Sequence, residues 1–322
     1  MRPEIRQLAS CAGSLRPWTF APVPCPRLTA GTMTELRVPA LLAQYAVGVT
    51  DPARQRWLDR LPDVIGRIAG LWELEVGDPF EPGGCSAWVA PARTASGGRV
   101  VLKVGWVHPE AAHEAAGLSL WDGNGAVRLH ASELAGDSVA MLLERCEPGT
   151  RLADVLPEPD QDEILCSLLL RLWREPPAGH DFPSLQEMCD RWAREYEADD
   201  NRPPLDPGIE RAGIELFRTL PASASRQVVL ATDLHNENIL AAQREPWLAI
   251  DPKPHVGDPA YDALQHMINC ERVVVDPAGL VQRMAGRLAL DPERLRLWLF
   301  ARSVQYLPQR PQLADVAVRL AP

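Results

Sequence analysis

The chain has 322 residues, of which 46% are hydrophobic and 24% charged, and its formal net charge is −10. A chain of this length corresponds to one large domain or two ordinary ones, and it can bury a core without disulfides or structural metals. Because phosphate contacts need grouped Lys and Arg, the dispersed basic residues argue against a nucleic-acid partner. No apolar run reaches the ~18 residues that span a bilayer, so the sequence also predicts no membrane partner.

The cysteines argue against a disulfide-rich fold. Seven of them are scattered along the chain, and no two form a C-x-x-C pair. An odd, dispersed set is typical of neither a disulfide framework nor a structural zinc site, so we expect a reducing, cytoplasmic environment. The seven residues are Cys11, Cys25, Cys85, Cys146, Cys166, Cys189 and Cys270.

The first 32 residues do not have the pattern of a signal peptide. Arg2, Arg6 and Arg16 supply early positive charge, but no apolar segment follows them. The sequence from Met33 onward looks like a more natural beginning. We therefore expect residues 1–32 to be poorly ordered or the product of an upstream start choice.

Up to residue 143 the sequence predicts a lobe that is mostly sheet. A helix over 51–74 opens with an aspartate and a proline and continues with apolar residues at helical spacing. Two apolar segments, 86–90 and 99–106, flank the turn "TASGG" and predict an antiparallel hairpin. The Ala- and Glu-rich stretch 108–123 predicts a helix that ends at a glycine. The other expected strands cover 71–76, 126–131 and 138–145.

Beyond the segment "CEPGT" the sequence becomes mainly helical, with apolar residues on one face of each predicted helix. One island of strand character, 227–252, interrupts the helices. The expected helices cover 161–175, 184–198, 208–220, 260–270, 279–288 and 292–304. We therefore expect an α+β protein with a small N-terminal lobe at 33–143, a hinge at 144–150 and a larger, helical C-terminal lobe at 151–322.

The segment 228–262 contains the residues best suited to chemistry. Asp233 is followed five positions later by Asn238, and the next residues predict a β-hairpin that ends at Asp251. Such a hairpin folds Asp251 back beside Asn238, so three polar side chains that are distant in the sequence come together. Asn238 and Asp251 offer the oxygen ligands that Mg²⁺ on nucleotide phosphates requires. Asp233 is then available to accept the proton of an attacking hydroxyl.

This pattern carries a family resemblance. The D-x-x-x-x-N spacing, the hairpin and the following I-D-P resemble the catalytic core of kinase-fold small-molecule phosphotransferases. More narrowly, "DLHNENILAAQREPWLAIDPKPHVGDPAYDA" is similar to the aminoglycoside and hydroxyurea phosphotransferase family, which includes streptomycin kinases. The resemblance implies a bilobal protein-kinase-like fold, with a small antiparallel-sheet lobe, a larger helical lobe, and nucleotide bound between them.

The resemblance assigns a role to each matching residue. Asp233 matches the catalytic base, and Asn238 and Asp251 match the Mg²⁺ ligands. Lys103 in "VVLKV" matches the strand lysine that pairs with the nucleotide phosphates. Glu114 matches the helix glutamate that holds this lysine, so that fixed positive charge faces the triphosphate.

Two further segments match nucleotide-binding parts of the family. Gly83, Gly84 and Ser86 lie where the phosphate-covering loop belongs, although the segment lacks a full G-x-G-x-x-G. Glu144 and Cys146 lie in the stretch that resembles the lobe connector, whose backbone groups bond to adenine.

The chain departs from the family pattern immediately before the catalytic loop. The family usually has H-G-D at this place, whereas this chain has Ala231, Thr232 and Asp233. Because the missing histidine usually braces the loop rather than reacting, the departure implies altered support for the loop and retained chemistry.

A metallohydrolase is a rival interpretation of the same segment. Asp233, His235, Asp251, His255 and Asp258 form a set rich in acids and histidines. Catalytic metal sites usually need several imidazoles and an open coordination position. This interpretation leaves the lysine–glutamate pair without a role, and His235 is then expected to hydrogen-bond within its loop.

Several residues keep more than one interpretation. Lys253 could contact phosphate or be solvated, and Glu110 is an alternative partner for the strand lysine. Asp258 is expected to accept backbone N–H bonds and so fix the segment after Asp251. Trp192 and Tyr196 are expected in the core rather than against a substrate.

The sequence and the resemblance together predict an enzyme. We expect a phosphotransferase that uses ATP and Mg²⁺ and acts on a hydroxyl of a small molecule. The resemblance implies an aminoglycoside of the streptomycin type or a hydroxyurea-like acceptor. A kinase of a metabolic sugar, amino alcohol or other natural product is an alternative, as is a nucleotide-binding pseudokinase that regulates a partner. The oligomeric state is left open between monomer and homodimer.

Overall fold

A computed structural model describes residues 27–28, 36–48, 52–108 and 112–322. The expectation for residues 1–32 therefore falls outside the described part of the chain, apart from Arg27 and Leu28. The chain divides into two compact units, each described by itself below. The first contains the described residues up to Gly123 together with Val127–Cys146, and the second contains Asn124–Ala126 and Glu147–Pro322. The roles predicted for two lobes and a hinge stay predictions.

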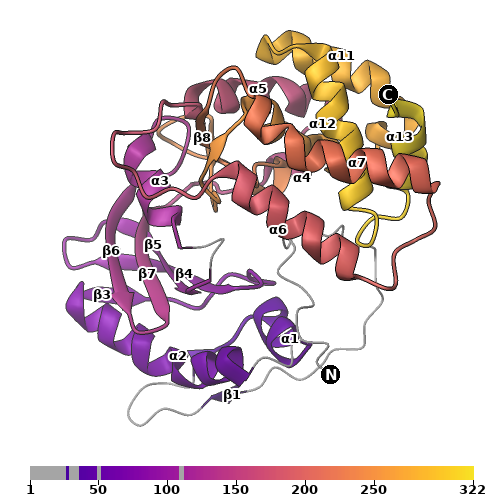
Figure 1. Cartoon of the computed structure of the whole chain (residues 1–322). Coiled ribbons are helices and arrows are strands. Elements are labelled where there is room, and N and C mark those ends of the chain that lie inside the picture. The colour runs from indigo at the N-terminus through magenta and orange to yellow at the C-terminus, as the bar shows by residue number, and fades with distance from the viewer. Residues whose placement is uncertain (1–26, 29–35, 49–51, 109–111) are drawn as a thin grey trace. The chain divides into compact units, whose positions relative to one another are not determined.

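The first unit is built on a five-stranded antiparallel sheet with the strand order β3-β4-β5-β7-β6 (Figure 1). Two short strands, β1 and β2, pair with each other separately. The strands are β1 (Arg27–Leu28), β2 (Leu36–Arg37), β3 (Leu74–Val76), β4 (Ala87–Thr94), β5 (Arg99–Trp106), β6 (Leu129–Ala135) and β7 (Ser138–Glu144). The helices are α1 (Ala40–Gly48), α2 (Pro52–Leu71) and α3 (Glu114–Trp121).

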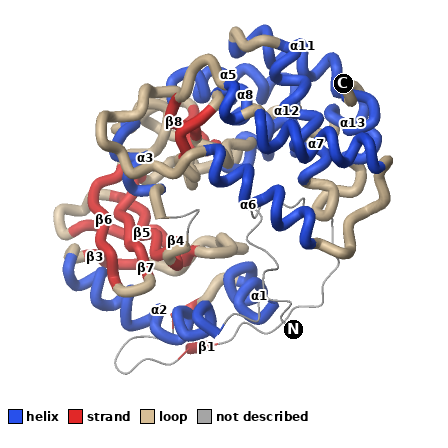
Figure 2. The backbone as a smooth tube through the Cα atoms, viewed as in Figure 1, coloured by secondary structure: helices blue, strands red, loops and turns tan. Residues whose placement is uncertain are grey.

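Helix α2 and the sheet form one hydrophobic core, and Figure 2 shows the helix beside the sheet. Trp57, Leu61 and Ile65 recur at helical spacing on α2 and are at most 1% exposed. They pack with inward-facing residues of the central strands, such as Leu102 and Val104, which are fully buried. The predicted hairpin is confirmed as β4 and β5. The sheet thereby fixes the backbone of the central strand on which the lysine of the candidate site lies.

Two boundaries in the first unit differ from the prediction. Helix α3 begins at Glu114 rather than 108, and residues 109–111 lie outside the described part of the chain. Strand β6 covers Leu129–Ala135 rather than 126–131, because Ala126 pairs instead with Ala249 inside the second unit.

The second unit is mainly helical, as predicted. Its helices are α4 (Leu152–Val155), α5 (Glu158–Leu172), α6 (Leu185–Ala198), α7 (Pro207–Thr219), α8 (Pro259–Asp262), α9 (Leu264–Asn269), α10 (Arg272–Val275), α11 (Pro277–Leu288), α12 (Pro292–Gln305) and α13 (Leu313–Leu320). Two 3₁₀ turns are η1 (Pro221–Ser223) and η2 (Asn236–Asn238). The strands β8 (Val228–Leu230) and β11 (His255–Gly257) pair with each other, as do β9 (Ile239–Ala241) and β10 (Trp247–Ala249). Strand β11 and helices α4, α10 and α13 were not predicted from the sequence, and the helix predicted over 260–270 is divided into α8 and α9.

Four helices of this unit begin with the same dipeptide, Asp-Pro. The aspartates Asp206, Asp258, Asp276 and Asp291 each accept a backbone N–H from the first turn, and proline occupies the first helical position. Proline suits this position because its fixed φ is already helical and its missing N–H would have no partner there. The sequence therefore sets where α7, α8, α11 and α12 begin.

The core of the second unit surrounds α12, which contacts α7, α11 and α13 (Figure 1). The indole of Trp298 meets the rings of Tyr261 and Phe217 edge to face, at centroid distances of 5.1 and 6.2 Å. Trp192 and Tyr196 are 7% and 3% exposed, which confirms that they belong to the core. This packing holds α8, the helix that follows the candidate site.

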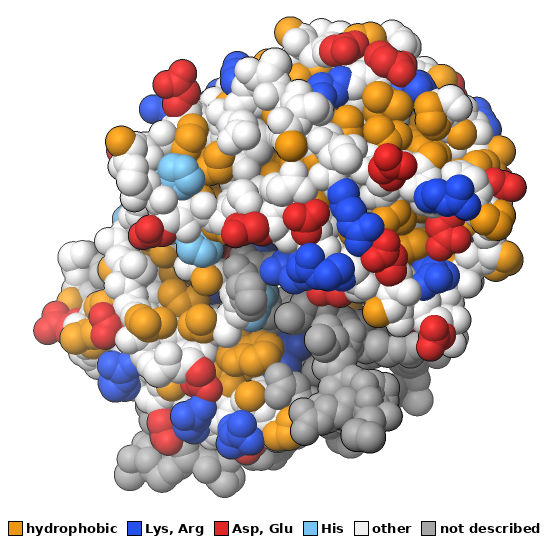
Figure 3. Space-filling view, in the orientation of Figure 1, with side chains coloured by type: hydrophobic (Ala, Val, Ile, Leu, Met, Phe, Trp, Pro, Cys, Tyr) orange, Lys and Arg blue, Asp and Glu red, His pale blue; other side chains and the backbone are white. Residues whose placement is uncertain are grey.

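Charged side chains of both signs are mixed on the face of the molecule shown in Figure 3. Several basic residues of the second unit pair with acidic neighbours, among them Arg218 with Glu197 and Arg202 with Glu210. In the part of the chain that the structure covers, no helix has the length and apolar character needed to cross a bilayer. The five described cysteines form no disulfide with one another: Cys85, Cys146, Cys166, Cys189 and Cys270.

Two glycines in helix interiors give a matched test of the packing. A Cβ atom on Gly213 of α7 would lie 2.5 Å from a methyl carbon of Val304, whereas one on Gly286 of α11 would meet nothing within 4 Å. We expect Gly213→Ala to lower the free energy of unfolding by about 1–3 kcal/mol through overpacking. Gly286→Ala should raise it by roughly 0.5–1 kcal/mol, because alanine restricts the unfolded chain. Denaturant unfolding checks both values, and equal effects of the two substitutions would contradict the packing of α7 on α12.

Candidate active site

The backbone bends sharply between β8 and Asp233. The Asp233 N–H donates to the Ala231 carbonyl at 2.8 Å, and Thr232 between them has a φ of 51°. A three-residue turn with positive φ is strained, above all for a β-branched residue. Two bonds hold it: the Thr232 hydroxyl donates to the Lys253 carbonyl, and the Lys253 N–H donates to the Ala231 carbonyl at 2.8 Å. The bend leaves the Asp233 side chain only 11% exposed.

The buried carboxylate of Asp262, on α8, accepts hydrogen bonds from this bend. Its carboxylate accepts the Thr232 N–H at 2.6 Å and both the Ala231 N–H and the Trp173 indole N–H at 3.0 Å. Burial raises the pKa of Asp262 to about 6, although each of the three donors lowers it. Above that pH the side chain is an ionised acceptor for three converging donors.

Asp262 therefore supports the turn that precedes Asp233, and the altered support implied by the missing histidine stays a prediction. The sequence contained a signal for this residue, because it closes the "GDPAYD" stretch. Its role was missed, since the backbone groups that it binds lie 30 and 31 residues upstream.

Asp258 fixes α8 in turn. Its Oδ1 accepts the Ala260 N–H at 3.0 Å, and its Oδ2 accepts bonds from Arg294 and Trp298 at 2.6 Å each. The expectation that Asp258 accepts backbone N–H bonds is confirmed. Because α8 carries Asp262, these contacts connect the core around α12 to the loop that presents Asp233.

The β9–β10 hairpin brings Asn238 and Asp251 together, as predicted. Ala249 pairs with Ile239, and the Ile250 N–H donates to the Asn238 carbonyl at 2.9 Å. The Asn238 side-chain N–H donates to the Asp233 carbonyl at 3.0 Å, so the amide nitrogen is used within the loop and the amide oxygen suits a cation. Asp251, with a φ of 53°, has a side chain that is 39% exposed.

Lys253 connects the two carboxylates. Its Nζ lies 2.9 Å from Asp251 Oδ1 and 3.9 Å from Asp233 Oδ2. Both carboxylates therefore face the same small volume, where the residue predicted as a base adjoins the residues predicted as metal ligands. The two side chains predicted as ligands, the amide of Asn238 and the carboxylate of Asp251, fit a hard divalent cation.

The ligand set of the metallohydrolase interpretation does not come together. His255 uses its Nδ1 on the Lys253 carbonyl at 2.9 Å, and Asp258 is occupied as described above. Burial lowers the pKa of His235, although Asp233 raises it. Among the described residues, one group of three acidic, histidine or cysteine side chains has ligand atoms within 4.8 Å of one another: Asp162, His266 and Cys270.

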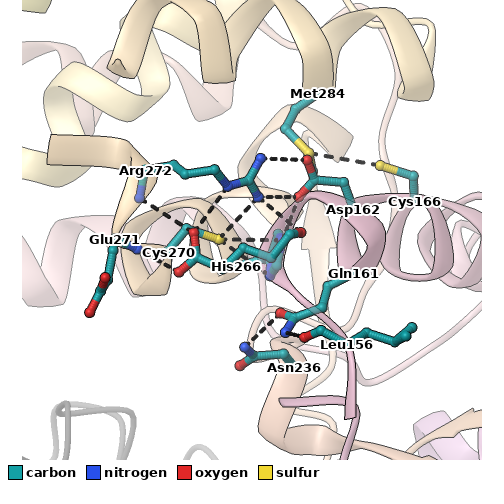
Figure 4. A network of polar contacts seen from close by, with 11 residues as sticks. Leu156, Gln161, Asp162, Cys166, Asn236, His266, Cys270, Glu271, Arg272 and Met284 are labelled. Atoms are coloured by element: carbon teal, nitrogen blue, oxygen red, sulfur yellow. Dashed lines mark hydrogen bonds and ion pairs between the residues drawn. The ribbon is translucent and has the colours of Figure 1, made fainter. Parts of the chain in front are cut away.

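That group is a buried network of polar contacts rather than a vacant ligand set (Figure 4). Asp162 of α5 lies 3.0 Å from His266 Nε2, and Arg272 donates to both of its carboxylate oxygens at 2.7 and 2.9 Å. The Cys270 sulfur lies 3.5 Å from His266 Nε2. The guanidinium therefore already supplies a cation at this place, and the network ties α5 to α9 and α10.

The same part of α5 reaches the catalytic loop. Asn236 donates to Gln161 at 2.8 Å, and Gln161 donates to the Leu156 carbonyl at 2.7 Å (Figure 4). Because Gln161 is the neighbour of Asp162, the network also supports this loop. No sequence pattern predicted this contact, which joins residues 75 positions apart.

In the first unit, Lys103 and Glu114 form a buried ion pair. The lysine Nζ lies 2.7 Å from both oxygens of Glu114, and the two residues are 8% and 2% exposed. Lys103 lies on β5, where it pairs with Val89 and Met141. The structure thus selects Glu114 as the partner of the lysine, while Glu110 lies outside the described residues.

The remaining predicted nucleotide-binding residues lie at or beside the ends of two inner strands of the same sheet, β4 and β7. Gly83, Gly84 and Ser86 form the bend that enters β4. Gly83 has a φ of 82°, and a Cβ there would lie 2.3 Å from Pro39, so the bend requires glycine. Glu144 ends β7 and uses its N–H on the Arg128 carbonyl at 2.8 Å, and Cys146 follows as a half-buried thiol. Contacts of these residues with a nucleotide stay predictions.

Comparison with known proteins places this site in a family. The profile of the aminoglycoside/hydroxyurea antibiotic resistance kinases matches residues 74–306. Streptomycin 6-kinase of Streptomyces griseus is 34% identical over 77% of this chain and 82% of its own. Hydroxyurea phosphotransferase of Kitasatospora aureofaciens is 31% identical over 84% and 79%. A macrolide 2′-phosphotransferase structure from Brachybacterium faecium shares the fold, with a TM-score of 0.52, 17% identity, and coverage of 81% and 97%.

The Asp162–His266 pair predicts a loss of stability in alkaline solution. Burial lowers the pKa of His266, but Cys270 and Asp162 outweigh it and raise the pKa to about 9 from 6.5. The bound proton therefore stabilises the fold fully below pH 6.5, and this contribution is lost as the pH rises through 9. The shift corresponds to about 3 kcal/mol. Asp162, with its pKa lowered to about 2, keeps its contribution throughout this range.

The free energy of unfolding measured from pH 6.5 to pH 9 tests this prediction. His266→Gln should remove most of the decline, since glutamine keeps hydrogen-bonding capacity without a proton to lose. An equal decline in the two proteins would show that His266 is not protonated in the folded state.

Proposed function

The chain belongs to the aminoglycoside/hydroxyurea antibiotic resistance kinase family, and on this premise we propose that it transfers the γ-phosphoryl group of ATP to a hydroxyl of a small antibiotic. The observation that carries the proposal is the convergence of Asp233, Asn238 and Asp251 at the end of one hairpin. The buried Lys103–Glu114 pair supports the nucleotide-binding half of the proposal.

Each residue has a defined part in the transfer. The Asp233 carboxylate accepts the proton of the acceptor hydroxyl and orients its oxygen toward the γ-phosphorus. A new bond forms between that oxygen and phosphorus, the bond from phosphorus to the bridging oxygen breaks, and ADP leaves with the electron pair. Lys103, held by Glu114, neutralises charge on the nucleotide phosphates. Within its own unit, each of these groups is held by neighbouring residues before the reaction begins.

A divalent cation fits beside these residues. Asn238 and Asp251 would hold it, because each offers an oxygen ligand and the Asp251 side chain is accessible. Mg²⁺, when bound, neutralises charge on the β- and γ-phosphates. ATP and Mg²⁺ are thus the proposed co-substrate and metal.

The acceptor class is inferred from the relatives. Their names give streptomycin and hydroxyurea as what they phosphorylate, and both molecules carry hydroxyl groups. We propose an acceptor of one of these two types for this chain. A screen of both compounds with ATP and Mg²⁺, followed by product mass analysis for one added phosphoryl group, tests the proposal.

Removal of either site carboxylate should abolish turnover. We expect Asp233→Asn and Asp251→Asn each to lower kcat at least a thousandfold, because the first removes the proton acceptor and the second a metal ligand. Coupled measurement of ADP release with the active acceptor checks this. The control is Asp63→Asn, which removes an exposed carboxylate on α2 of the first unit and should change kcat less than twofold. ATP binding without turnover of any acceptor by the unmodified protein would favour a pseudokinase instead.

Substitution of Lys103 on β5 should weaken the interaction of the enzyme with ATP. We expect Lys103→Met to raise KM for ATP and lower kcat/KM for ATP at least tenfold, while KM for the acceptor changes little. Glu114→Gln should show a smaller effect in the same direction, since it leaves the ammonium without this carboxylate. Glu133→Gln on β6, an exposed carboxylate of the same sheet, serves as control. A change confined to KM for the acceptor would place Lys103 outside the nucleotide site.

A further inference from the structure

The chain is almost free of lysine. Its 33 basic residues comprise 31 arginines and two lysines, Lys103 and Lys253. Lysine differs from arginine in carrying its charge on a compact ammonium that can move between partners, whereas the guanidinium is a planar fork. Most ion pairs of the described residues use arginine, and one of the two lysines is the strand lysine of the proposed nucleotide site.

Lys253 makes its contacts with the proposed base and a proposed metal ligand. Its Nζ lies 2.9 Å from Asp251 Oδ1, 3.2 Å from the Asp251 carbonyl and 3.9 Å from Asp233 Oδ2. The lysine side chain is 15% exposed, so water screens these charges only partly. Two carboxylates that face one small volume repel each other, and the ammonium reduces that repulsion.

The backbone of Lys253 cannot move away from the catalytic loop independently. Its N–H donates to the Ala231 carbonyl, and its carbonyl accepts bonds from the Thr232 hydroxyl and from His255. These bonds lie on both sides of the lysine Cα. The ammonium can therefore change partners by rotation of its own side chain while it stays within reach of Asp233.

We propose that Lys253 is an exchangeable counter-ion and a catalytic residue: it neutralises Asp233 and Asp251 before metal binds, and then binds the transferred phosphoryl group. This inference rests on the proposed phosphotransferase function. A divalent cation held by Asp251 would repel the ammonium and would replace it as the partner of that carboxylate. The ammonium keeps its place beside Asp233, where the anionic oxygens of the γ-phosphoryl group must arrive for attack.

In this position Lys253 contributes to the transfer without exchanging a proton. The hydroxyl proton goes to Asp233, the phosphoryl group passes to the acceptor oxygen, and ADP departs. Lys253 neutralises charge on the equatorial oxygens throughout, as fixed cations do in phosphoryl transfer. A purely structural ion pair would leave Lys253 on Asp251 in every state, and this difference can be measured.

Isotope labelling observes the exchange directly, because two lysines give two signals. In protein grown with lysine labelled with ¹³C at Cε, the Lys253 resonance is identified by its absence from Lys253→Arg. We expect Mg²⁺ alone to shift this resonance, and a non-hydrolysable ATP analogue added with Mg²⁺ to shift it further. A Lys253 resonance that stays unchanged through both additions would overturn the proposal.

Substitutions test the two roles separately. Lys253→Met should bind Mn²⁺ about tenfold more tightly in the absence of nucleotide, measured by electron paramagnetic resonance, because the competing cation is gone. The same variant should lose roughly a hundredfold in kcat. Lys253→Arg should keep the Mn²⁺ affinity of the unmodified protein and recover part of kcat. Arg226→Met, which removes an exposed positive charge just before β8, is the matched control and should change neither quantity.

The outcomes separate this proposal from the proposed function. Unchanged Mn²⁺ affinity of Lys253→Met, or a kcat within twofold of the unmodified protein, overturns the role of Lys253 while phosphotransfer stands. Absence of turnover by the unmodified protein with every acceptor refutes the proposed function, and the phosphoryl-binding role with it. The Mn²⁺ and resonance measurements still decide whether Lys253 is an exchangeable counter-ion in that case, since neither requires turnover.

Discussion

In the second unit, the bend of the backbone before Asp233 is held by one buried carboxylate, that of Asp262. It accepts three N–H donors, two of them from the backbone immediately before Asp233. A buried backbone N–H without a partner costs about 1–3 kcal/mol, so these bonds strongly favour the bent loop. Asp262 is held on a helix whose first turn is capped by Asp258, and Asp258 binds Trp298 in the centre of the core. The packing of the helices therefore helps to determine where the side chain of Asp233 lies.

The second constraint is electrostatic. The proposed function requires Asp233 and Asp251 to lie close together, which is unfavourable in itself because like charges in a poorly screened volume repel. The ammonium of Lys253, which lies on the same segment as Asp251, reduces this repulsion. In the first unit the roles of the charges are exchanged. There the buried group is the ammonium of Lys103, and the carboxylate of Glu114 neutralises it. Each unit thus pairs a lysine with a carboxylate of its own.

Local sequence signals predicted much of this architecture. Asp-Pro pairs mark where helices begin, apolar spacing identifies α2, and the hairpin after Asn238 follows from its turn residues. The convergence of Asp233 and Asp251 could be anticipated because a hairpin is a local structure. The roles of Asp262, Gln161 and the Asp162 network could not, because each depends on contacts between residues 30 to 110 positions apart. Strand β11 is three residues long, too short for a periodic pattern to show.

Thr232 shows how the loop compensates for an unusual residue. Where the family usually has glycine, this chain places a β-branched residue at a φ of 51° and secures it through a hydroxyl bond to the Lys253 carbonyl. A glycine would allow the turn to flex by itself. With threonine, the turn is hydrogen-bonded to the segment that contains Lys253. A change in the conformation of one segment therefore requires a change in the other. The backbone before the proposed base and the backbone of Lys253 are therefore expected to move together, and only the lysine side chain can move by itself.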